Sequence, residues 1–170
     1  DAFDTGLAGK LERLGEVTTD KDRLPEADVV LIRSKTKATK EYIDSAPKLK
    51  LIIRGGVGTD NIDKVHAAAK NIIVRNTPKA SSIAVAECAF ALMIAVPNHV
   101  VKGHQGMTEG KWLKKELKRT ELYGKTLGII GCGNIGAIVA DRALGLKMKV
   151  AAYDPFLSPE RAGVIGVDKV

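Results

Sequence analysis

A glycine-rich turn between two apolar runs is the feature that most constrains how this chain can fold. Residues 127–130 are apolar, and the motif Gly-Cys-Gly-Asn-Ile-Gly follows at once at positions 131–136. A helix-like segment then leads to a second apolar run, residues 149–153, which ends on Asp154. Strand, glycine turn, helix, strand and acid in this order are typical of a Rossmann unit that binds a dinucleotide.

Each glycine has a separate task in that motif. Gly131 permits the tight turn, Gly133 leaves room for the pyrophosphate beside the backbone, and Gly136 lets the helix pack closely on the strand. The N–H groups and the positive dipole end of the helix attract the phosphates. Asp154 stands where a carboxylate would bind the ribose 2′-hydroxyl and repel a 2′-phosphate, so the pattern predicts NAD over NADP. The alternative is a turn that serves only helix packing.

Length and composition set the outer limits. The 170 residues suffice for one large domain or two small ones, and 45% apolar with only 4% aromatic residues predicts an aliphatic core. No apolar run has the length of a membrane span and no leader is recognisable, so we expect no membrane partner. The two cysteines form no disulfide framework, which favours a cytoplasmic location. The three histidines have no metal-ligand spacing, and no metal is expected.

The positive charge is concentrated in one segment. The net charge is +7, and more than half of the excess lies in residues 111–125; residues 109–125 are here called the basic arm. A nucleic-acid patch is one interpretation of such a segment. The arm has few aromatic residues and contains interspersed acids, however, so a solvated face or a subunit contact is the favoured interpretation and no nucleic acid is expected.

Apolar runs and helix-forming segments alternate along the rest of the chain, which predicts parallel sheets covered on both faces. A short strand is expected to begin at Val17, Thr39 is expected to cap a helix, and Ser81 or Ser82 another. Strands are predicted over residues 28–32, 49–53 and 72–74, and helices over residues 4–14, 39–46, 63–70 and 83–95, with a further helix after Pro97 to about residue 108.

Two arginines stand at the ends of predicted strands. Arg33 ends one strand, with Lys35 close by, and Arg54 ends the next, before the glycine turn at residues 55–58. Ligands of open α/β sheets bind outside the carboxyl ends of the strands. Guanidinium forks and the amide groups of a glycine turn both bind anions, which predicts an anionic substrate here. The alternative for each arginine alone is a solvated strand end.

Seven stretches of the chain resemble the D-isomer-specific 2-hydroxyacid dehydrogenases, and within that family the sequence looks most like the D-3-phosphoglycerate dehydrogenases. The matching stretches are residues 32–36, 54–63, 74–78, 85–87, 110–112, 124–136 and 153–155. Seven matches in the right order are very hard to obtain by chance.

The resemblance implies an α/β fold with parallel sheets. Residues 1–75 would form a flavodoxin-like substrate domain that lacks its first strand, and residues 76–100 would supply a connecting helix. Residues 101–170 would be the first half of a Rossmann NAD-binding domain, with the basic arm at its start. Family members are usually homodimers or homotetramers built on that second domain, so the arm around Trp112 would be a subunit contact.

The resemblance also implies site residues. The substrate carboxylate would be held by Arg54 and the amides of Gly56 and Val57, and a substrate phosphate would be neutralised near Arg33, Ser34 and Lys35. The residues expected at the cofactor are Thr77, Gly131, Gly133, Asn134, Ile135, Gly136, Asp154 and Pro155.

The catalytic arginine, glutamate and histidine of the family have no matching motif here, so no catalytic residue is expected in this chain. The implied activity is NAD-dependent oxidation of a small anionic D-2-hydroxy acid, 3-phosphoglycerate to 3-phosphohydroxypyruvate in serine biosynthesis. The alternatives are another substrate of the same family (glycerate, glyoxylate or hydroxypyruvate, or a branched 2-oxo acid) and a non-catalytic fragment of a longer enzyme.

Overall fold

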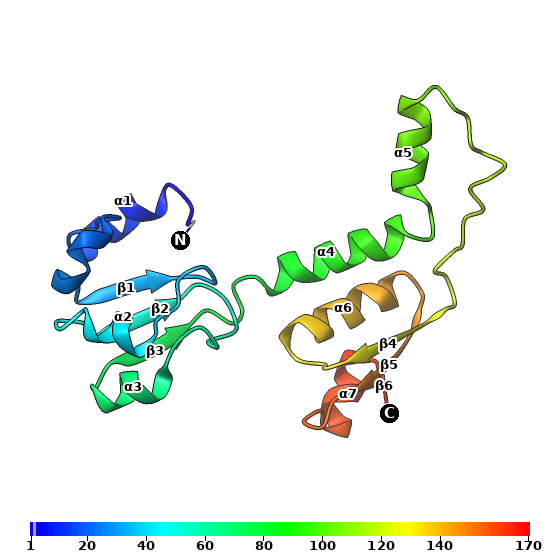
Figure 1. The fold of residues 1–170 in the computed structure, drawn as a ribbon. Helices are drawn as coiled ribbons and strands as arrows, with labels where there is room; N and C mark the ends of the chain where they lie inside the picture. Colours follow the sequence, from blue (N-terminus) through cyan, green and yellow to red (C-terminus); the bar gives the residue numbers. More distant parts are fainter. Residues whose placement is uncertain (2) are drawn as a thin grey trace. The chain divides into compact units, whose positions relative to one another are not determined.

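Two separate three-stranded parallel sheets organise the chain (Figure 1). The computed structural model describes residue 1 and residues 3–170. These divide into two compact units, Asp1–Ala80 and Ser81–Val170, each with one sheet. The predicted α/β class with parallel sheets is confirmed. Residues 76–100 are divided between the units, and the roles assigned above to the two parts of the chain stay predictions.

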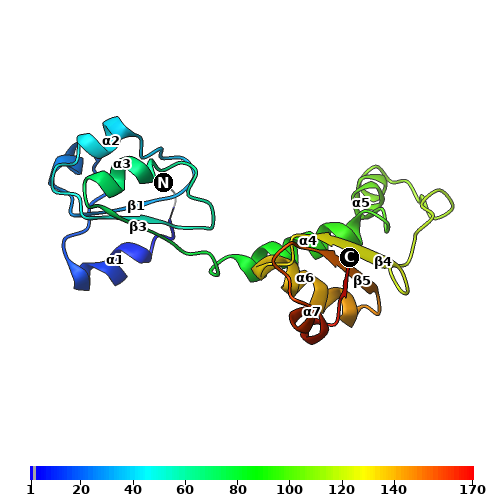
Figure 2. The ribbon, with the colours of Figure 1, turned by 90° about the horizontal axis from the view of Figure 1, so that it is seen from below.

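The first unit is built on a sheet whose strands follow the chain order β1-β2-β3, in a register that aligns Val29 with Leu51 and Leu51 with Ile73. Helix α1 lies on one side of the sheet, and α2 and α3 lie on the other (Figures 1 and 2). The elements are α1 (Leu7–Leu11), the 3-10 helices η1 (Glu12–Leu14) and η2 (Lys21–Glu26), β1 (Val29–Ile32), α2 (Lys40–Asp44), β2 (Leu51–Arg54), α3 (Lys64–Ala69) and β3 (Ile73–Asn76).

The core of this unit is aliphatic, as the composition predicts. It lies mainly between the sheet and the α2–α3 side, since α1 has no buried residue. Its buried members are Val30, Ile32, Ala38, Ile43, Ala46, Leu49, Ile52, Ile62, Ala67 and Ile72.

Side-chain caps and one carboxylate fix the two short helices of the first unit. The predicted cap of α2 is confirmed, because Thr39 Oγ1 accepts a hydrogen bond from the Tyr42 amide at 3.4 Å. Asp44 at the end of α2 is paired with Lys70 and lies 2.9 Å from His66 Nε2, which ties α2 to α3. Hydrogen bonds from Lys70 and His66 lower the pKa of Asp44 to about 2.

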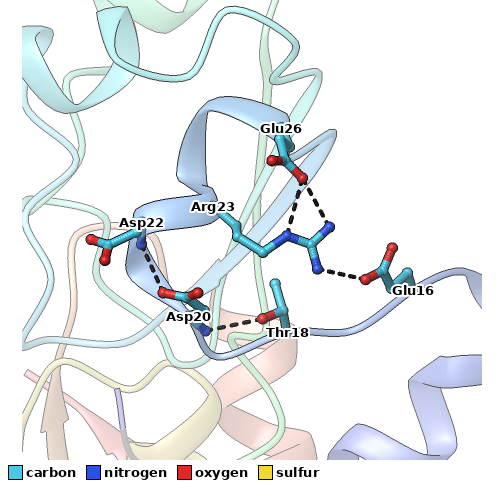
Figure 3. Close-up of polar contacts among 6 residues, drawn as sticks. All are labelled: Glu16, Thr18, Asp20, Asp22, Arg23 and Glu26. Carbon is cyan, nitrogen blue, oxygen red and sulfur yellow. Dashed lines mark hydrogen bonds and ion pairs between the residues drawn. The ribbon is translucent and has the colours of Figure 1, made fainter.

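The strand predicted from Val17 is wrong. The segment before η2 pairs with no strand and is held instead by polar contacts, as Figure 3 shows. Arg23 donates to Glu16 at 2.5 Å and to Glu26 at 2.9 and 3.0 Å, and it lowers the pKa of Glu16. Asp20 caps η2 through the Asp22 amide at 3.0 Å. One isolated valine supplies too little apolar surface to add a strand to the sheet.

The second unit is built on the sheet β4-β5-β6. Helix α4 packs against α6, and its Glu87 lies 3.6 Å from Arg142 of α6. The elements are α4 (Ser82–Ala95), α5 (Val100–Thr108), β4 (Thr126–Ile130), α6 (Asn134–Gly145), β5 (Lys149–Tyr153), α7 (Pro159–Ile165) and β6 (Asp168–Lys169). The buried members of its core are Phe90, Ile129, Cys132, Ala140, Ala143, Met148, Val150, Ala152, Leu157, Ala162 and Val167.

Three details of the second unit differ from the prediction. Ser81 is the N-cap of α4, but its side chain makes no capping hydrogen bond. Helix α7 was not predicted, although Ser158 caps it through the Arg161 amide at 3.2 Å and Pro159 occupies its first turn. Strand β6 was also missed, because two residues are too short to show a periodic pattern.

The predicted interruption at Pro97 is confirmed. Helices α4 and α5 are bent by 64°, and His99 between them adopts a left-handed conformation with φ of 53°. Within residues 1 and 3–170, no single helix has both the length and the apolarity of a membrane span, and only this bent pair reaches them jointly.

Candidate functional site

The glycine turn after β4 leaves an uncovered stretch of main chain. Gly131 has a φ of 90°, and its amide donates to the Tyr153 carbonyl at 2.8 Å. A Cβ added at Gly131 or Gly133 would meet no atom within 4 Å. At Gly136 a Cβ would lie 2.3 Å from the Gly131 carbonyl oxygen, so only glycine fits. The turn is thus open at its outer positions and closed where the helix meets it.

Helix α6 begins directly at this turn. Gly133 is its N-cap residue, and no side chain caps the first amide groups. The exposed Asn134 and the half-buried Ile135 occupy the first two helical positions. An uncapped N-terminus of a twelve-residue helix offers free N–H donors and a positive dipole end, which suits a phosphate group.

The carboxylate of Asp154 reaches back to the glycine turn. Its Oδ2 accepts from the Cys132 amide and its Oδ1 from the Phe156 amide, both at 2.8 Å. Each oxygen of a carboxylate has a second lone pair, so both can still accept a hydroxyl donor. Asp154 therefore lies at the carboxyl ends of β4 and β5 beside the open turn, with the exposed Pro155 next to it. The two main-chain bonds were not foreseen from the sequence.

Cys132 is a buried part of the turn rather than a reactive group. Its side chain belongs to the core of the second unit, with only 3% of its surface exposed. Burial raises the pKa of its thiol, so the neutral form is favoured.

The residues predicted for the substrate gather at the carboxyl ends of β1, β2 and β3 in the first unit. Arg33, Ser34 and Lys35 follow β1 and are exposed, and Arg54 is the last residue of β2. The Arg54 guanidinium lies over Gly56, because a Cβ there would come within 1.5 Å of Nη1. Arg54 Nε is buried and has no hydrogen-bond partner within residues 1 and 3–170. An unpaired donor at this position favours an anionic ligand.

Residues at the end of β3 form hydrogen bonds with the glycine turn that follows β2. The Gly56 amide donates to Thr77 Oγ1 at 2.9 Å, and the Thr77 amide donates to the Gly56 carbonyl at 3.0 Å. Asn76 Nδ2 donates to the Val57 carbonyl at 2.6 Å. The Gly56 amide is thus already engaged, whereas those of Val57 and Gly58 make no hydrogen bond with any part of the chain that the structure describes.

The predicted residues therefore form two groups. Thr77 lies with the substrate residues in the first unit, and the other predicted cofactor residues lie in the second. Sequence reasoning missed Asn61 and Asn76, whose amide side chains bond to the main chain of the loops that follow β1 and β2. Their position next to strand ends and glycine turns was the available signal. No group of three metal-ligating side chains occurs within residues 1 and 3–170.

Comparison with known proteins agrees with the family resemblance of the sequence motifs. The family model described as D-isomer specific 2-hydroxyacid dehydrogenase, catalytic domain, matches residues 7–157. The chain belongs to this family. The match extends through both units and includes the glycine turn and Asp154.

Two relatives from the family carry different names. A hydroxypyruvate reductase from Thermotoga maritima is 51% identical over 147 residues, which are 82% of this chain and 48% of that protein. A D-3-phosphoglycerate dehydrogenase from Synechocystis sp. is 46% identical over 145 residues, 85% of this chain and 26% of that protein. The chain thus spans about half or less of these relatives.

A solved structure shows the same fold. The D-lactate dehydrogenase from Aquifex aeolicus, complexed with NAD and lactic acid, superposes with a TM-score of 0.84 at 26% identity. The superposition covers 98% of this chain and 53% of that one.

Proposed function

We propose that this chain is part of an NAD-dependent oxidoreductase that acts on a small anionic D-2-hydroxy acid. The observation that carries the proposal is the open glycine turn at the start of α6 with the Asp154 carboxylate bonded beside it. The family supports it, as does the NAD complex of the Aquifex aeolicus relative. We include a cytoplasmic location in the proposal, because the named relatives are metabolic enzymes.

The open turn, the uncapped start of α6 and the Asp154 carboxylate suit the pyrophosphate and the adenosine ribose of NAD. The amides of the glycine turn and of Asn134 and Ile135 would hold the pyrophosphate, and Asp154 would accept from the adenosine ribose. A 2′-phosphate would meet the Asp154 charge, which favours NAD over NADP. The chemistry that NAD supplies when bound is acceptance of the hydride from substrate C2.

The residues of the first unit would bind and orient the acid. Arg54 and the free amides of Val57 and Gly58 would hold the carboxylate, while Gly56 would keep the turn in shape through Thr77. Arg33, Ser34 and Lys35 would hold a phosphate at the other end of the molecule. We therefore propose 3-phosphoglycerate as the substrate, with oxidation to 3-phosphohydroxypyruvate as in serine biosynthesis. The residues that move the hydroxyl proton are expected in the family motifs that this chain does not match.

The Thermotoga maritima relative supports a second candidate, an enzyme for an unphosphorylated acid such as hydroxypyruvate or glycerate. The two candidates differ in their need for Arg33 and Lys35.

Replacing Arg33 and Lys35 together with alanine should separate these candidates. We expect the affinity for 3-phosphoglycerate to fall about 100-fold, because each charge-assisted bond to the phosphate contributes about 1.5 kcal/mol. The affinity for glycerate should change less than about threefold. Titration calorimetry of the double variant and of a Lys10→Ala, Arg13→Ala control with both ligands and with NAD measures this. Equal losses for the two acids would favour the unphosphorylated substrate.

We also propose that the chain forms a homodimer or homotetramer through α4, α5 and the basic arm. Helix α4 buries only Ser82, Ala86 and Phe90. Exposed apolar side chains occur along all three segments, namely Ile83, Leu92, Val96, Val100, Val101, Met107 and Trp112, each with more than half of its surface exposed. Apolar surface of this extent is typical of an interface.

Sedimentation of the 170-residue chain tests this assembly. We expect at least twice the 18.1 kDa mass of one chain. Val101→Glu should shift the chain towards the monomer, because a buried unpaired charge costs several kcal/mol at an interface. The control is Val164→Glu on α7, which is also exposed. A monomeric wild-type chain at micromolar concentration would contradict the proposal.

A further inference from the structure

The side-chain amide of Asn61 connects two loops of the first unit that are distant in sequence. Its Nδ2 donates to the Arg33 carbonyl at 2.8 Å and to the Thr36 carbonyl at 2.7 Å. These carbonyls stand at the two ends of the turn that presents Arg33, Ser34 and Lys35. We propose that Asn61 is a positioning residue that holds this turn in the shape required to bind a substrate phosphate. The inference rests on the function proposed above.

The main chain around Asn61 is itself hydrogen-bonded to the loop after β1. The Ala38 amide donates to the Asn61 carbonyl at 2.9 Å, and the Asp63 amide donates to the Ala38 carbonyl at 2.9 Å. These bonds form a parallel bridge between Ala38 and Ile62, which are 0% and 6% exposed. The loop after β1 is therefore joined to the loop after β2 in two ways. Main-chain hydrogen bonds link Ala38 to Asn61 and Asp63, and the side chain of Asn61 links to the carbonyls of Arg33 and Thr36.

The residue type matters for this task. A primary amide carries two N–H donors on one nitrogen, and Asn61 uses them for two different carbonyls. An alanine would leave both carbonyls without this partner, and an aspartate would place acceptors against acceptors. Asp1 accepts from the amides of Arg33 and Thr36, whereas Asn61 donates to the carbonyls of the same two residues.

A fixed turn changes the energetics of binding. Arginine and lysine lose considerable side-chain entropy when they bind an anion, and a mobile turn would add its own backbone entropy to that loss. Holding both ends of the turn removes the backbone part in advance. The resulting gain in binding free energy applies to a ligand that contacts this turn, and not to an acid that lacks the phosphate.

The test compares Asn61→Ala with a matched control, Asn98→Ala. Asn98 Nδ2 also donates to a main-chain carbonyl, that of Ile94 at 2.9 Å, but it lies in the second unit. For each chain, NMR titration gives the affinities for 3-phosphoglycerate and glycerate, and amide hydrogen exchange is followed over residues 33–38. Asn61→Asp is the near-isosteric second variant, should Asn61→Ala fail to fold.

We expect Asn61→Ala to bind 3-phosphoglycerate about tenfold more weakly, since two hydrogen bonds are lost, with glycerate affinity changed less than about threefold. Exchange over residues 33–38 should be faster in Asn61→Ala and in Asn61→Asp, and unchanged in Asn98→Ala. A role confined to stability would leave the preference for the phosphorylated acid unchanged, and that outcome overturns the proposal.

Failure of the proposed substrate would be seen separately. If the wild-type chain binds neither acid, the substrate assignment fails, and the exchange data then decide the inference about Asn61. Unchanged exchange over residues 33–38 in Asn61→Ala and in Asn61→Asp would overturn it, and faster exchange would uphold the positioning of the turn.

Discussion

The variant Gly136→Ala is expected to lose NAD affinity by on the order of 100-fold and to unfold at a lower temperature. The added Cβ would lie 2.3 Å from the Gly131 carbonyl oxygen, which is main chain and cannot rotate away. Either the turn or the start of α6 must therefore shift, at a cost of about 3 kcal/mol for overpacking a close contact. The shift would move the amide groups proposed to hold the pyrophosphate. Titration calorimetry with NAD and thermal unfolding measure the two effects.

Gly145→Ala is the control for this experiment. Gly145 is the last residue of the same helix, and a Cβ there would meet no atom within 4 Å. Alanine is favoured over glycine in a helix by up to about 1 kcal/mol, so this variant should bind NAD normally and unfold no earlier than wild type. Wild-type NAD affinity in Gly136→Ala would show that the close contact between turn and helix does not shape the cofactor site.

Replacing Asp154 with alanine is expected to weaken NAD binding by about 10- to 100-fold and NADP binding by much less. The carboxylate has two roles that the substitution removes together. It accepts from the Cys132 and Phe156 amides in the absence of any ligand, and its second lone pairs are available for the ribose. The charge that would repel a 2′-phosphate also disappears, so NADP regains part of the binding free energy that it loses with the hydrogen bonds.

Asp141→Ala controls for the loss of one negative charge. Asp141 is exposed on α6 and makes no hydrogen bond or ion pair within the described part of the chain. Calorimetric titration of both variants with NAD and NADP should show no change in preference for Asp141→Ala. If the ratio of the NAD and NADP affinities is unaltered in Asp154→Ala, Asp154 does not bind the ribose. If the thermal stability is unaltered, Asp154 does not hold the turn.

Much of the fold could be predicted because local signals agreed with the tertiary structure. The apolar runs that become β1, β2 and β5 form strands within one or two residues of the expected bounds. Thr39 caps α2 as expected. The errors fall where the local signal was weak: the expected strand at Val17 has no apolar partner, and α7 with β6 is short.

The placement of the candidate residues at strand ends was predictable, and their contacts were less so. The positions of Arg33, Arg54 and Asp154 at strand ends follow from the alternation of strands and helices alone. That the Gly56 amide bonds to Thr77, and that Asn61 bridges two carbonyls of another loop, depends on which loops meet. No spacing along the chain encodes these contacts.

The sequence by itself determined the alternation of strands and helices, the family, and the need for glycine at position 136, since each depends on periodicity or on a motif of adjacent residues. Only the tertiary structure decided which amide groups of the two glycine turns are engaged and which are free. Parallel strands carry loops distant in sequence to the same edge of a sheet, and a hydrogen bond formed there requires the right distance and direction, which residue types do not specify.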